Sequence, residues 1–415
     1  MEEQFRNISI AEYTYELPPE RIAMHPLQQR DLSNLLVYRH GQIEKGIFRH
    51  IDQYLPASSL MVFNNTRVVQ ARLLFQKESG ATIEIFCLEP AGAVKDVQLA
   101  FAEKGQSTWF CMVGNAKKWK QGSLTAKVGE QGILRAHKLE KSKDGYTILF
   151  EWEGDMSFAE ILDVAGKTPL PPYIGRKAEE EDKTRYQTIY ARHSGSVAAP
   201  TAGLHFTDRV MQQLALRNIK TTQLTLHVGA GTFKPVSSST IGDHHMHQEQ
   251  IIVSRQTIES LLAHADGNIV SVGTTSLRTL ESLYWLGAKI IKGYAIPEDG
   301  FHIQQWEPYR YSVLLPAVEQ SMAAIVNYMK EKDIETLHGE TSLIIVPGYR
   351  VRMARMLVTN FHQPGSTLLL LVAAFCGNDW QKIYQFALDN DFRFLSYGDS
   401  CLMFRNDAQE YQNEI

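Results

Sequence analysis

Apolar and polar residues alternate over residues 66–153, whereas helical and strand patterns succeed one another along the rest of the chain. Within residues 66–153, short alternating runs are separated by Gly and Asp-Gly turns, which is typical of half-buried strands joined by hairpins. Four of these runs are expected to form strands, at residues 67–75, 82–89, 108–113 and 146–153. Because no convincing helical stripe is present, the pattern predicts a small antiparallel barrel or sandwich.

The flanking residues predict helices and strands in alternation. Thr207, Ser254 and Ser366 each precede a helical run and are expected to cap it with a side-chain oxygen. A further helix is expected at residues 276–286, and strands are expected at residues 221–228, 268–272, 343–348 and 355–360. Such alternation predicts an α/β layer that carries its chemistry on loops.

The strand-rich segment lies inside the chain, so it is expected to be an insertion. We predict a larger, mixed α/β layered domain formed by residues 1–65 and 154–415, interrupted by an inserted antiparallel β-barrel domain of residues 66–153. The chain has 415 residues, of which 44% are apolar and 21% charged, and this is ample material for separate cores.

Charge and cysteine content restrict the class of protein. The net charge is −4, so any nucleic-acid surface must be a local patch. The four cysteines form no C-x-x-C pair, which suits a reducing cytosol. The first residues, MEEQFRNISI, lack the pattern of a signal peptide. The longest apolar run, residues 368–376, is far shorter than the roughly 20 residues of a membrane span. We therefore expect a cytoplasmic protein without membrane contact.

Two loops combine glycine with histidine. Residues 194–207, SGSVAAPTAGLHFT, hold glycines, a proline and hydroxyls before a helix, so their N–H groups could receive an anion. The alternative is a capped loop in which His205 makes one structural hydrogen bond. Residues 226–235, LHVGAGTFKP, contain Gly229 and Gly231 but lack the third glycine of a dinucleotide fingerprint. They remain suitable as a wall for a flat base.

Two further loops follow predicted strands. Thr274, Thr275 and Ser276 crowd one helix start, where a single hydroxyl would suffice as a cap. The surplus indicates a bound carboxylate or ribose, and plain capping is the alternative. In TNFHQPGST, residues 359–367, Asn360 and His362 would project from a loop stiffened by proline. All four loops can converge if their strands share a sheet.

A histidine cluster and a basic stretch each allow two interpretations. DHHMHQE, residues 243–249, matches no standard zinc spacing, so its histidines are expected to donate hydrogen bonds or carry protons rather than bind metal. Residues 109–120 interleave aromatic and basic side chains, and residues 66–153 hold 13 Lys and Arg against 10 Asp and Glu. This contrast with the acidic remainder favours an RNA-facing patch over a merely solvated face.

Long motifs run in order along nearly the whole chain. They include VFNNTRVVQARL, YQTIYARHSGSVAAPTAGLHFT, TLHVGAGTFKPV, HMHQE, VGTTSLRTLES, VPGYR, TNFHQPGSTLL and FLSYGDSCLMF. These segments resemble those of the S-adenosylmethionine:tRNA ribosyltransferase-isomerases. Departures occur at Asn65, Gln70 and Gly365, where the family has Asp, Pro and Lys, and over residues 294–338.

The resemblance implies transfer and isomerisation of the ribosyl moiety of S-adenosylmethionine onto 7-aminomethyl-7-deazaguanine at the wobble position of tRNA. Epoxyqueuosine-tRNA would form, with release of adenine and methionine. S-adenosylmethionine would be the ribosyl-donating substrate, no metal would be needed, and the enzyme would act as a monomer with tRNA as its partner. One alternative is a diverged enzyme that uses S-adenosylmethionine on a free nucleoside or another RNA. A non-catalytic RNA-binding module would not need the histidine-bearing loops.

The residues for this chemistry follow from the matching motifs. The proton-transfer candidates are His205, His227, His247 and His362, with Asp399 and Glu281 as carboxylate alternatives. Expected substrate-binding residues are Phe206, Gly229, Gly231, Phe233, Thr274, Thr275, Ser276, Arg278 and Asn360. Residues 274–278 would take the methionine carboxylate or the ribose, and Phe206 and Phe233 could sandwich a base. Expected tRNA contacts are Arg67, Lys117, Lys118 and Lys120.

Overall fold

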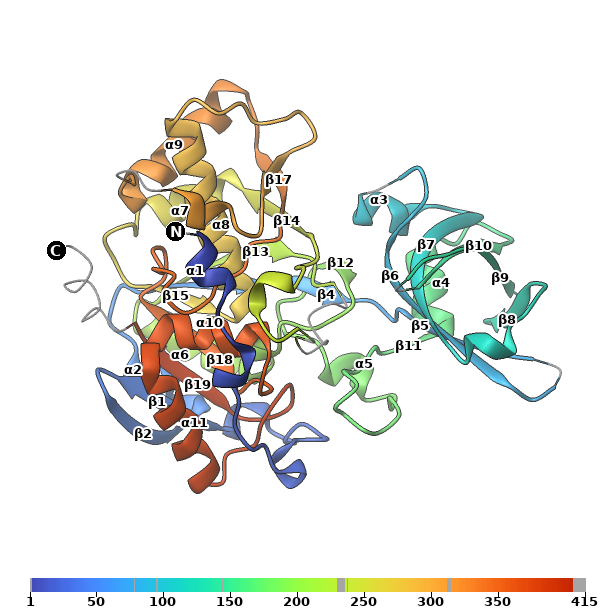
Figure 1. Ribbon diagram of the computed structural model, residues 1–415, viewed down its shortest axis with the longest axis horizontal. Coiled ribbons are helices and arrows are strands. Elements are labelled where there is room, and N and C mark those ends of the chain that lie inside the picture. Colours follow the sequence, from blue (N-terminus) through green and yellow to red (C-terminus); the bar gives the residue numbers. More distant parts are fainter. Residues whose placement is uncertain are drawn as a thin grey trace.

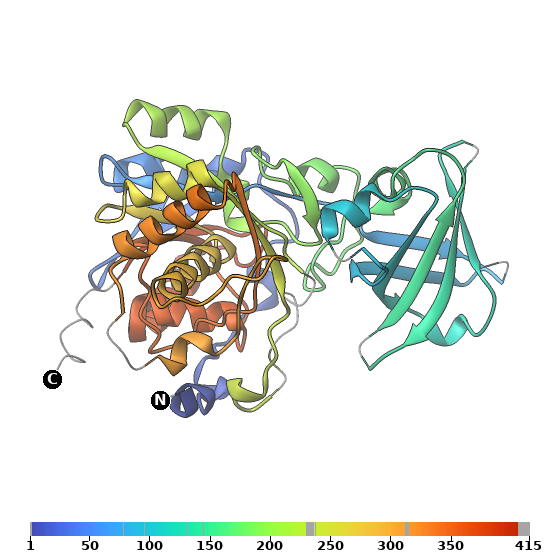
Figure 2. The same cartoon turned by 90° about the horizontal axis from the view of Figure 1, so that it is seen from above.

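The protein forms a larger and a smaller lobe joined by a narrow connection (Figures 1 and 2). The computed structural model describes residues 2–77, 79–94, 96–130, 132–143, 145–229, 236, 238–311 and 315–405. The first and last described elements, α1 (Glu2–Arg6) and β19 (Ser400–Phe404), both belong to the larger lobe (Figure 1). Among the described residues, no helix is long and apolar enough to cross a membrane.

A mixed sheet of ten strands, counted over the described residues, runs through the larger lobe. In spatial order its strands are β16 (Phe301–Ile303), β17 (Thr336–Thr341), β14 (Glu249–Ser254), β13 (Lys220–Leu226), β3 (Leu60–Asn64), β15 (Ile269–Val272), β18 (Met356–Asn360), β19 (Ser400–Phe404), β1 (Asn34–Arg39) and β2 (Gln42–Ile47). The central strands β13, β3, β15 and β18 are parallel to one another. Their carboxyl ends therefore lie at the same end of the sheet.

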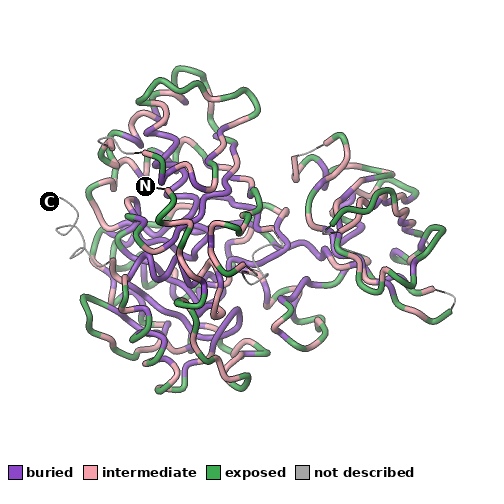
Figure 3. The backbone as a smooth tube through the Cα atoms, viewed as in Figure 1, coloured by how far each residue is buried: buried purple, intermediate pink, exposed green. Residues whose placement is uncertain are grey.

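Both faces of this sheet are covered, so the central strands β3, β15 and β18 are buried along their whole length. In β1, Leu35 and Val37 pack on one face, whereas Leu36 and Tyr38 pack on the other. Figure 3 shows the resulting buried interior. One face carries α7 (Arg255–Leu262), α8 (Thr274–Ile291), α9 (Val318–Glu331), α10 (Thr367–Cys376) and α11 (Trp380–Asp389). The opposite face carries α2 (Ile51–Tyr54) and α6 (Asp208–Leu216). The short helices α1 (Glu2–Arg6) and α5 (Asp182–Arg185) lie outside these layers.

The predicted helix caps are confirmed. The hydroxyls of Thr207, Ser254 and Ser366 accept hydrogen bonds from backbone N–H groups in the first turns of α6, α7 and α10. The helix expected at residues 276–286 begins earlier, at Thr274, and its N-cap is Gly273, whose φ of 90° favours glycine. All three hydroxyls at this helix start therefore lie inside the helix, and none of them caps it.

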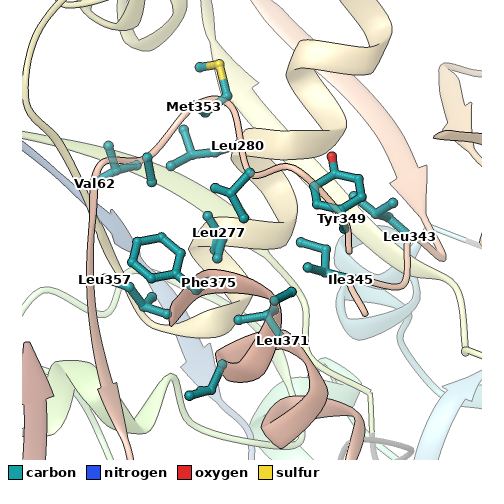
Figure 4. Close-up of a cluster of buried hydrophobic side chains, with 14 of the residues drawn as sticks. Val62, Leu277, Leu280, Leu343, Ile345, Tyr349, Met353, Leu357, Leu371 and Phe375 are labelled. Atoms are coloured by element: carbon teal, nitrogen blue, oxygen red, sulfur yellow. The ribbon is translucent and has the colours of Figure 1, made fainter. Parts of the chain in front are cut away.

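The strand expected at residues 343–348 is wrong, although the segment is buried and extended. Its N–H groups bond to isolated acceptors instead of a neighbouring strand: Leu343 donates to the Thr341 hydroxyl and Val346 to Tyr309. A buried segment that pairs with no neighbouring strand has the same run of apolar residues as a buried strand. The sequence pattern therefore does not distinguish the two. In Figure 4, Leu343 and Ile345 of this segment lie beside Leu277 of α8 and Leu371 of α10.

The smaller lobe is a curved antiparallel sheet of seven strands within the described residues (Figure 1). Their spatial order is β11 (Gly166–Lys167), β5 (Arg72–Gln76), β6 (Thr82–Pro90), β7 (Gln106–Gly114), β10 (Tyr146–Trp152), β9 (Gly132–Lys141) and β8 (Leu124–Val128). It encloses its own core, to which α3 (Val97–Ala102) and α4 (Phe158–Ala165) contribute. Among these residues β8 forms no strand ladder with β5 or β11, so the sheet is strongly curved but not a closed barrel.

The run expected as one strand over residues 67–75 is divided between two sheets. β4 (Thr66–Val68) pairs in parallel with β12 (His193–Ser196) between the lobes, and β5 begins at Arg72. Where the smaller lobe ends, Lys167 of β11 pairs with Arg72 of β5. A Cβ at Gly166 would lie 1.9 Å from the carbonyl oxygen of Gln70, so this crossing requires glycine. Both α4 and β11 follow residue 153, where the sequence placed the end of the strand-rich segment.

Candidate active site

Polar loops meet at the carboxyl end of the four central strands. Residues 227–229 follow β13, Asn65 follows β3, Gly273 follows β15 and residues 361–366 follow β18. Adjacent parallel strands bring such segments together, and ligand sites of open α/β sheets lie there. The expected convergence of the polar loops is therefore present.

The first hollow at this end, called here the threonine cavity, encloses about 750 Å³ when the open solvent at its mouth is included. Thr274 and Thr275, on the first turn of α8, form one wall. Asn360 and His362 form another, and residues 198–202 close a third side. Threonine, asparagine and histidine side chains thus face a space whose lining is mostly apolar, which is typical of small-ligand sites.

A second hollow, called here the arginine cavity, encloses about 520 Å³ when the open solvent at its mouth is included. Arg278 and Glu249 lie on its wall with Gly229, His244 and His247. Apolar side chains of residues 343–345 and of Leu371 of α10 also line this cavity, near the cluster in Figure 4. The side chain of Leu368 lines both cavities, so the two adjoin.

A third hollow, the inter-lobe cleft, encloses about 1240 Å³ when the open solvent at its mouth is included. The larger lobe contributes His227, His247 and Gln250, and the smaller lobe contributes Glu89 and Phe110. Gly229 and His247 also line the arginine cavity. All three hollows therefore meet around residues 228–229, at the end of β13.

His227 is buried at the inter-lobe cleft and is held from both lobes. Its Nδ1 lies 2.9 Å from the Thr66 hydroxyl, and its Nε2 lies 3.1 Å from the amide nitrogen of Gln98 on α3. Because that amide nitrogen can only donate, Nε2 accepts and Nδ1 carries the proton. Burial lowers the pKa of His227 to about 4, so the ring is neutral near pH 7. A Cβ at Gly195 would lie 2.5 Å from this ring, so glycine is required there.

His205 is held in the same manner but lies behind the wall of the threonine cavity. Its Nδ1 lies 2.8 Å from the Ser33 hydroxyl, and its Nε2 lies 3.2 Å from the amide nitrogen of Asn360. The amide of Asn360 is oriented by the Thr201 hydroxyl, 2.8 Å from its oxygen. Burial lowers the pKa of His205 to about 4. His205 is thus a neutral ring that supports Asn360 rather than a side chain on the cavity surface.

His362 lines the threonine cavity directly. Its Nε2 lies 2.9 Å from the Thr359 hydroxyl, which leaves Nδ1 for a ligand. Burial lowers the pKa of His362 to about 3, so this ring is also neutral near pH 7. Of the four histidines expected to transfer protons, His362 alone lines this cavity in the described chain, whereas His227 and His247 line the cleft.

The histidine cluster near residue 245 is spread over different environments. His245 and His247 are exposed, whereas His244 is half-buried and its pKa is lowered, mainly by burial. Over the described residues, no group of three or more His, Cys, Asp or Glu side chains has a metal-binding arrangement.

Arg278 and Glu249 form an ion pair that is almost completely removed from solvent. Nη1 of Arg278 contacts Oε2 of Glu249, and the side chains are 7% and 4% exposed. The guanidinium Nε donates to the carbonyl oxygen of Leu343 at 3.0 Å, while Nη2 has no hydrogen-bond partner among the described residues. A buried guanidinium donor without a partner is costly, which makes this wall suited to an anionic group.

Several residues expected at the site lie elsewhere. Phe206 is fully buried between Phe48 and Phe63, with ring centroids 4.9 Å away, so stacking on a ligand would require these neighbours to move. Ser276 is fully buried inside α8. Gly231 and Phe233 lie outside the described residues.

The two alternative carboxylates have structural partners. Glu281 accepts hydrogen bonds from Tyr349 and from the N–H groups of Arg352 and Met353, and burial raises its pKa. Asp399 accepts from Arg393 and Asn34 and is completely buried. Neither carboxylate lines the three hollows in the described chain, so both serve to hold loops together.

The expected RNA contacts are exposed but lie away from the hollows. Lys117, Lys118 and Lys120 follow β7, and the ring of Trp119 between them is buried in the core of the smaller lobe. None of these lysines lines the inter-lobe cleft in the described part of the lobe. Arg67 is exposed on β4, between the lobes.

Sequence patterns missed three residues of the site. Glu249 belongs to the DHHMHQE segment, for which the sequence predicts no metal site, but it shares a strand face with Ile251 and Val253 and must therefore point inward. Gln98 lies on a six-residue helix that no periodicity predicts, and Ser33 contacts His205 from 172 residues away. Only Glu249 had a local signal.

Comparisons with known proteins cover nearly the whole chain. The model of the queuosine biosynthesis protein family matches residues 10–403. Three similar curated proteins are called S-adenosylmethionine:tRNA ribosyltransferase-isomerase. That of Pelobacter propionicus is 37% identical over 95% of this chain and 99% of its own. That of Halothermothrix orenii is 35% identical over 95% and 100%, and that of an Azoarcus species 36% over 96% and 99%.

One similar solved structure is that of S-adenosylmethionine tRNA ribosyltransferase from Thermotoga maritima. It is 28% identical and the match covers 95% of this chain and 100% of that chain, with a TM-score of 0.45.

Proposed function

The chain belongs to the queuosine biosynthesis protein family, and from this premise we propose that it is an S-adenosylmethionine:tRNA ribosyltransferase-isomerase. The reaction would transfer and isomerise the ribosyl moiety of S-adenosylmethionine onto 7-aminomethyl-7-deazaguanine at the wobble position of tRNA. Epoxyqueuosine-tRNA would form, and adenine and methionine would leave. The observation that carries this proposal is the match of relatives with this activity over almost the full length of the chain.

The three hollows support such a reaction, because it needs two large substrates to meet. The threonine and arginine cavities together would hold S-adenosylmethionine, with Thr274, Thr275, Arg278 and Asn360 as its polar contacts. The inter-lobe cleft would admit the modified base of tRNA beside Gly229. In this arrangement both substrates approach residues 228–229, where the hollows adjoin.

The chemistry requires a base and a hydrogen-bond donor. The positive sulfur of S-adenosylmethionine acidifies the protons of the neighbouring ribosyl carbon, and a neutral imidazole could remove one of them. Adenine leaves more readily when it accepts a hydrogen bond. His362 would act from the threonine cavity, while His227 and His247 would act from the cleft. His205 would act through Asn360, since that amide separates it from the cavity. No metal is assigned a role.

The two lobes would divide the work. Residues 1–65 and 154–415 would form the catalytic domain. The inserted domain of residues 66–153, the β-barrel of the sequence analysis, would contact tRNA, and Arg67 would be one of its contacts. The separate hydrophobic cores of the two lobes support this division, although α4 and β11 pack with the smaller lobe. The enzyme would act as a monomer.

A turnover assay tests the proposed activity. We expect adenine and methionine to appear together, with a new tRNA nucleoside, when the protein meets S-adenosylmethionine and tRNA carrying the aminomethyl-deazaguanine base. Parallel reactions with and without chelator are compared, and unmodified tRNA is the control. Adenine release without a new tRNA nucleoside would instead favour an enzyme acting on another acceptor. Activity that is lost with chelator and restored by zinc would show that a metal takes part.

Replacing Lys117, Lys118 and Lys120 with alanine tests the role of the smaller lobe. We expect the KM for tRNA to rise several-fold and its dependence on salt to flatten, because each lost phosphate contact lowers the slope by about one. Binding of S-adenosylmethionine should be unchanged, since the lysines do not line its cavities. Alanine at Lys292, an exposed lysine of the larger lobe, is the control. An unchanged salt slope would mean that the three lysines only solvate the surface.

A further inference from the structure

The ion pair of Arg278 and Glu249 is well suited to recognise both charged groups of an amino acid. Nη2 of Arg278 is buried without a partner among the described residues and belongs to a side chain on the wall of the arginine cavity. The neighbouring Glu249 accepts from Arg278 through Oε2 and from the N–H of Gly229 through Oε1, at 3.3 Å. Each carboxylate oxygen has a further lone pair, so a second donor can be accepted.

The free-energy cost of burying this ion pair indicates that the pair serves a ligand. Taking a guanidinium and a carboxylate out of water is repaid only when every donor and acceptor is satisfied. A pair retained only for stability would have its donors filled by protein groups, as in the Arg176–Asp182 pair of the same lobe. In Arg278, Nη1 and Nε donate hydrogen bonds to protein acceptors, whereas Nη2 has no hydrogen-bond partner among the described residues. The missing partner is therefore an acceptor brought by a ligand, and a carboxylate matches a guanidinium best.

The rest of the cavity limits what carries that carboxylate. Beside Arg278, Glu249 supplies negative charge for an ammonium group, and the apolar side chains of Leu343, Ile345 and Leu371 line the same cavity. An ammonium and a carboxylate on one carbon, followed by a short apolar chain, describe the methionine end of S-adenosylmethionine. Building on the proposed function, we infer that Arg278 binds the carboxylate and Glu249 the ammonium group of the donor's methionine moiety.

This inference fixes the direction of the donor. The arginine cavity joins the threonine cavity at Leu368, so the adenosine end would extend past Leu368 toward Thr274 and Thr275. The two threonines then contact the ribose or the adenine, and the carboxylate is left to Arg278. The sequence predicts that residues 274–278 bind the methionine carboxylate or the ribose. In this arrangement the two threonines at the helix start contact the ribose or the adenine, and Arg278 binds the carboxylate.

Titration calorimetry with two nucleosides tests the assignment. S-adenosylhomocysteine carries the amino acid end, whereas 5′-methylthioadenosine lacks it. We expect the unaltered protein to bind S-adenosylhomocysteine about 100-fold more tightly, the scale of two hydrogen bonds between charged groups. In the double variant Arg278→Gln/Glu249→Gln, which replaces the charged pair with a neutral one, this preference should fall below about threefold. Binding of 5′-methylthioadenosine should stay the same.

The control double variant is Arg176→Gln/Asp182→Asn, which neutralises a comparable buried pair outside the arginine cavity. This control variant should still bind S-adenosylhomocysteine about 100-fold more tightly than 5′-methylthioadenosine. If the Arg278 double variant does not fold, the single variant Arg278→Lys is used, because it retains the charge. Its affinity for S-adenosylhomocysteine should fall at least tenfold, while its affinity for 5′-methylthioadenosine should not change. A preference that survives in the Arg278 variants, or an equal loss for both nucleosides, would overturn the inference. An unaltered protein that binds neither nucleoside and releases no adenine would overturn the proposed function instead.

Discussion

Replacing His205 with alanine should lower the turnover number about 100-fold or more, the usual scale for losing a group that supports proton transfer. The imidazole holds the side-chain amide of Asn360 from behind and is itself fixed by Ser33. Without the ring, Asn360 keeps only its contacts to Thr201 and to the carbonyl oxygen of Asp399, so the wall of the threonine cavity loses its order. Single-turnover measurement of adenine release reports this loss.

Glutamine at position 205 separates two roles of the ring. A glutamine amide can still bond to Asn360 but cannot carry a proton, so recovered turnover would assign His205 to positioning, and continued failure would assign it to proton transfer. Alanine at His264, a half-buried histidine at the end of α7, is the control and should leave turnover unchanged. A normally active His205→Ala variant would remove His205 from the site.

Acidification from pH 7 to pH 5 should lower the free energy of unfolding by about 6 kcal/mol, about 2 kcal/mol for each of three histidines. Burial lowers the pKa values of His205 and His227 to about 4 and that of His362 to about 3. In the unfolded chain these groups take up protons near pH 6.5. Between pH 6.5 and about 4 the unfolded state therefore binds more protons, and stability falls as the pH falls. Urea midpoints measured from pH 8 to pH 5 report the slope.

Glutamine variants show which ring produces the slope. Each of His205→Gln, His227→Gln and His362→Gln should lower the difference in bound protons between the unfolded and folded states by about one at pH 5. A free energy of unfolding that is constant between pH 7 and pH 5 would mean that the three rings are protonated in the folded protein.

Local signals in the sequence were sufficient for much of the fold. A hydroxyl before an amphipathic run marked the starts of α6, α7 and α10, because capping depends only on neighbouring residues. Predictions that depended on distant partners were less accurate. Residues 67–75 read as one strand but divide between two sheets, and residues 343–348 are as apolar as a strand yet pair with side chains.

The candidate site shows the same limit. Glycines, hydroxyls and histidines after predicted strands located the loops that meet at the end of β13, β3, β15 and β18. The partner of each side chain was not visible, since Ser33, Gln98 and Glu249 come from distant segments. For this reason four histidines were grouped as proton carriers, although they lie at different hollows or behind a wall.

The pairing of Arg72 with Lys167, where the smaller lobe begins and ends, bears on how this protein arose. The two chain ends of that lobe are hydrogen-bonded neighbours, so a short turn could replace the whole lobe without displacing β3 or β12. Insertions between adjacent ends disturb a host fold least. An ancestor could therefore have acquired the lobe in one genetic event, and descendants could vary or exchange it while the cavities on the central sheet stayed intact.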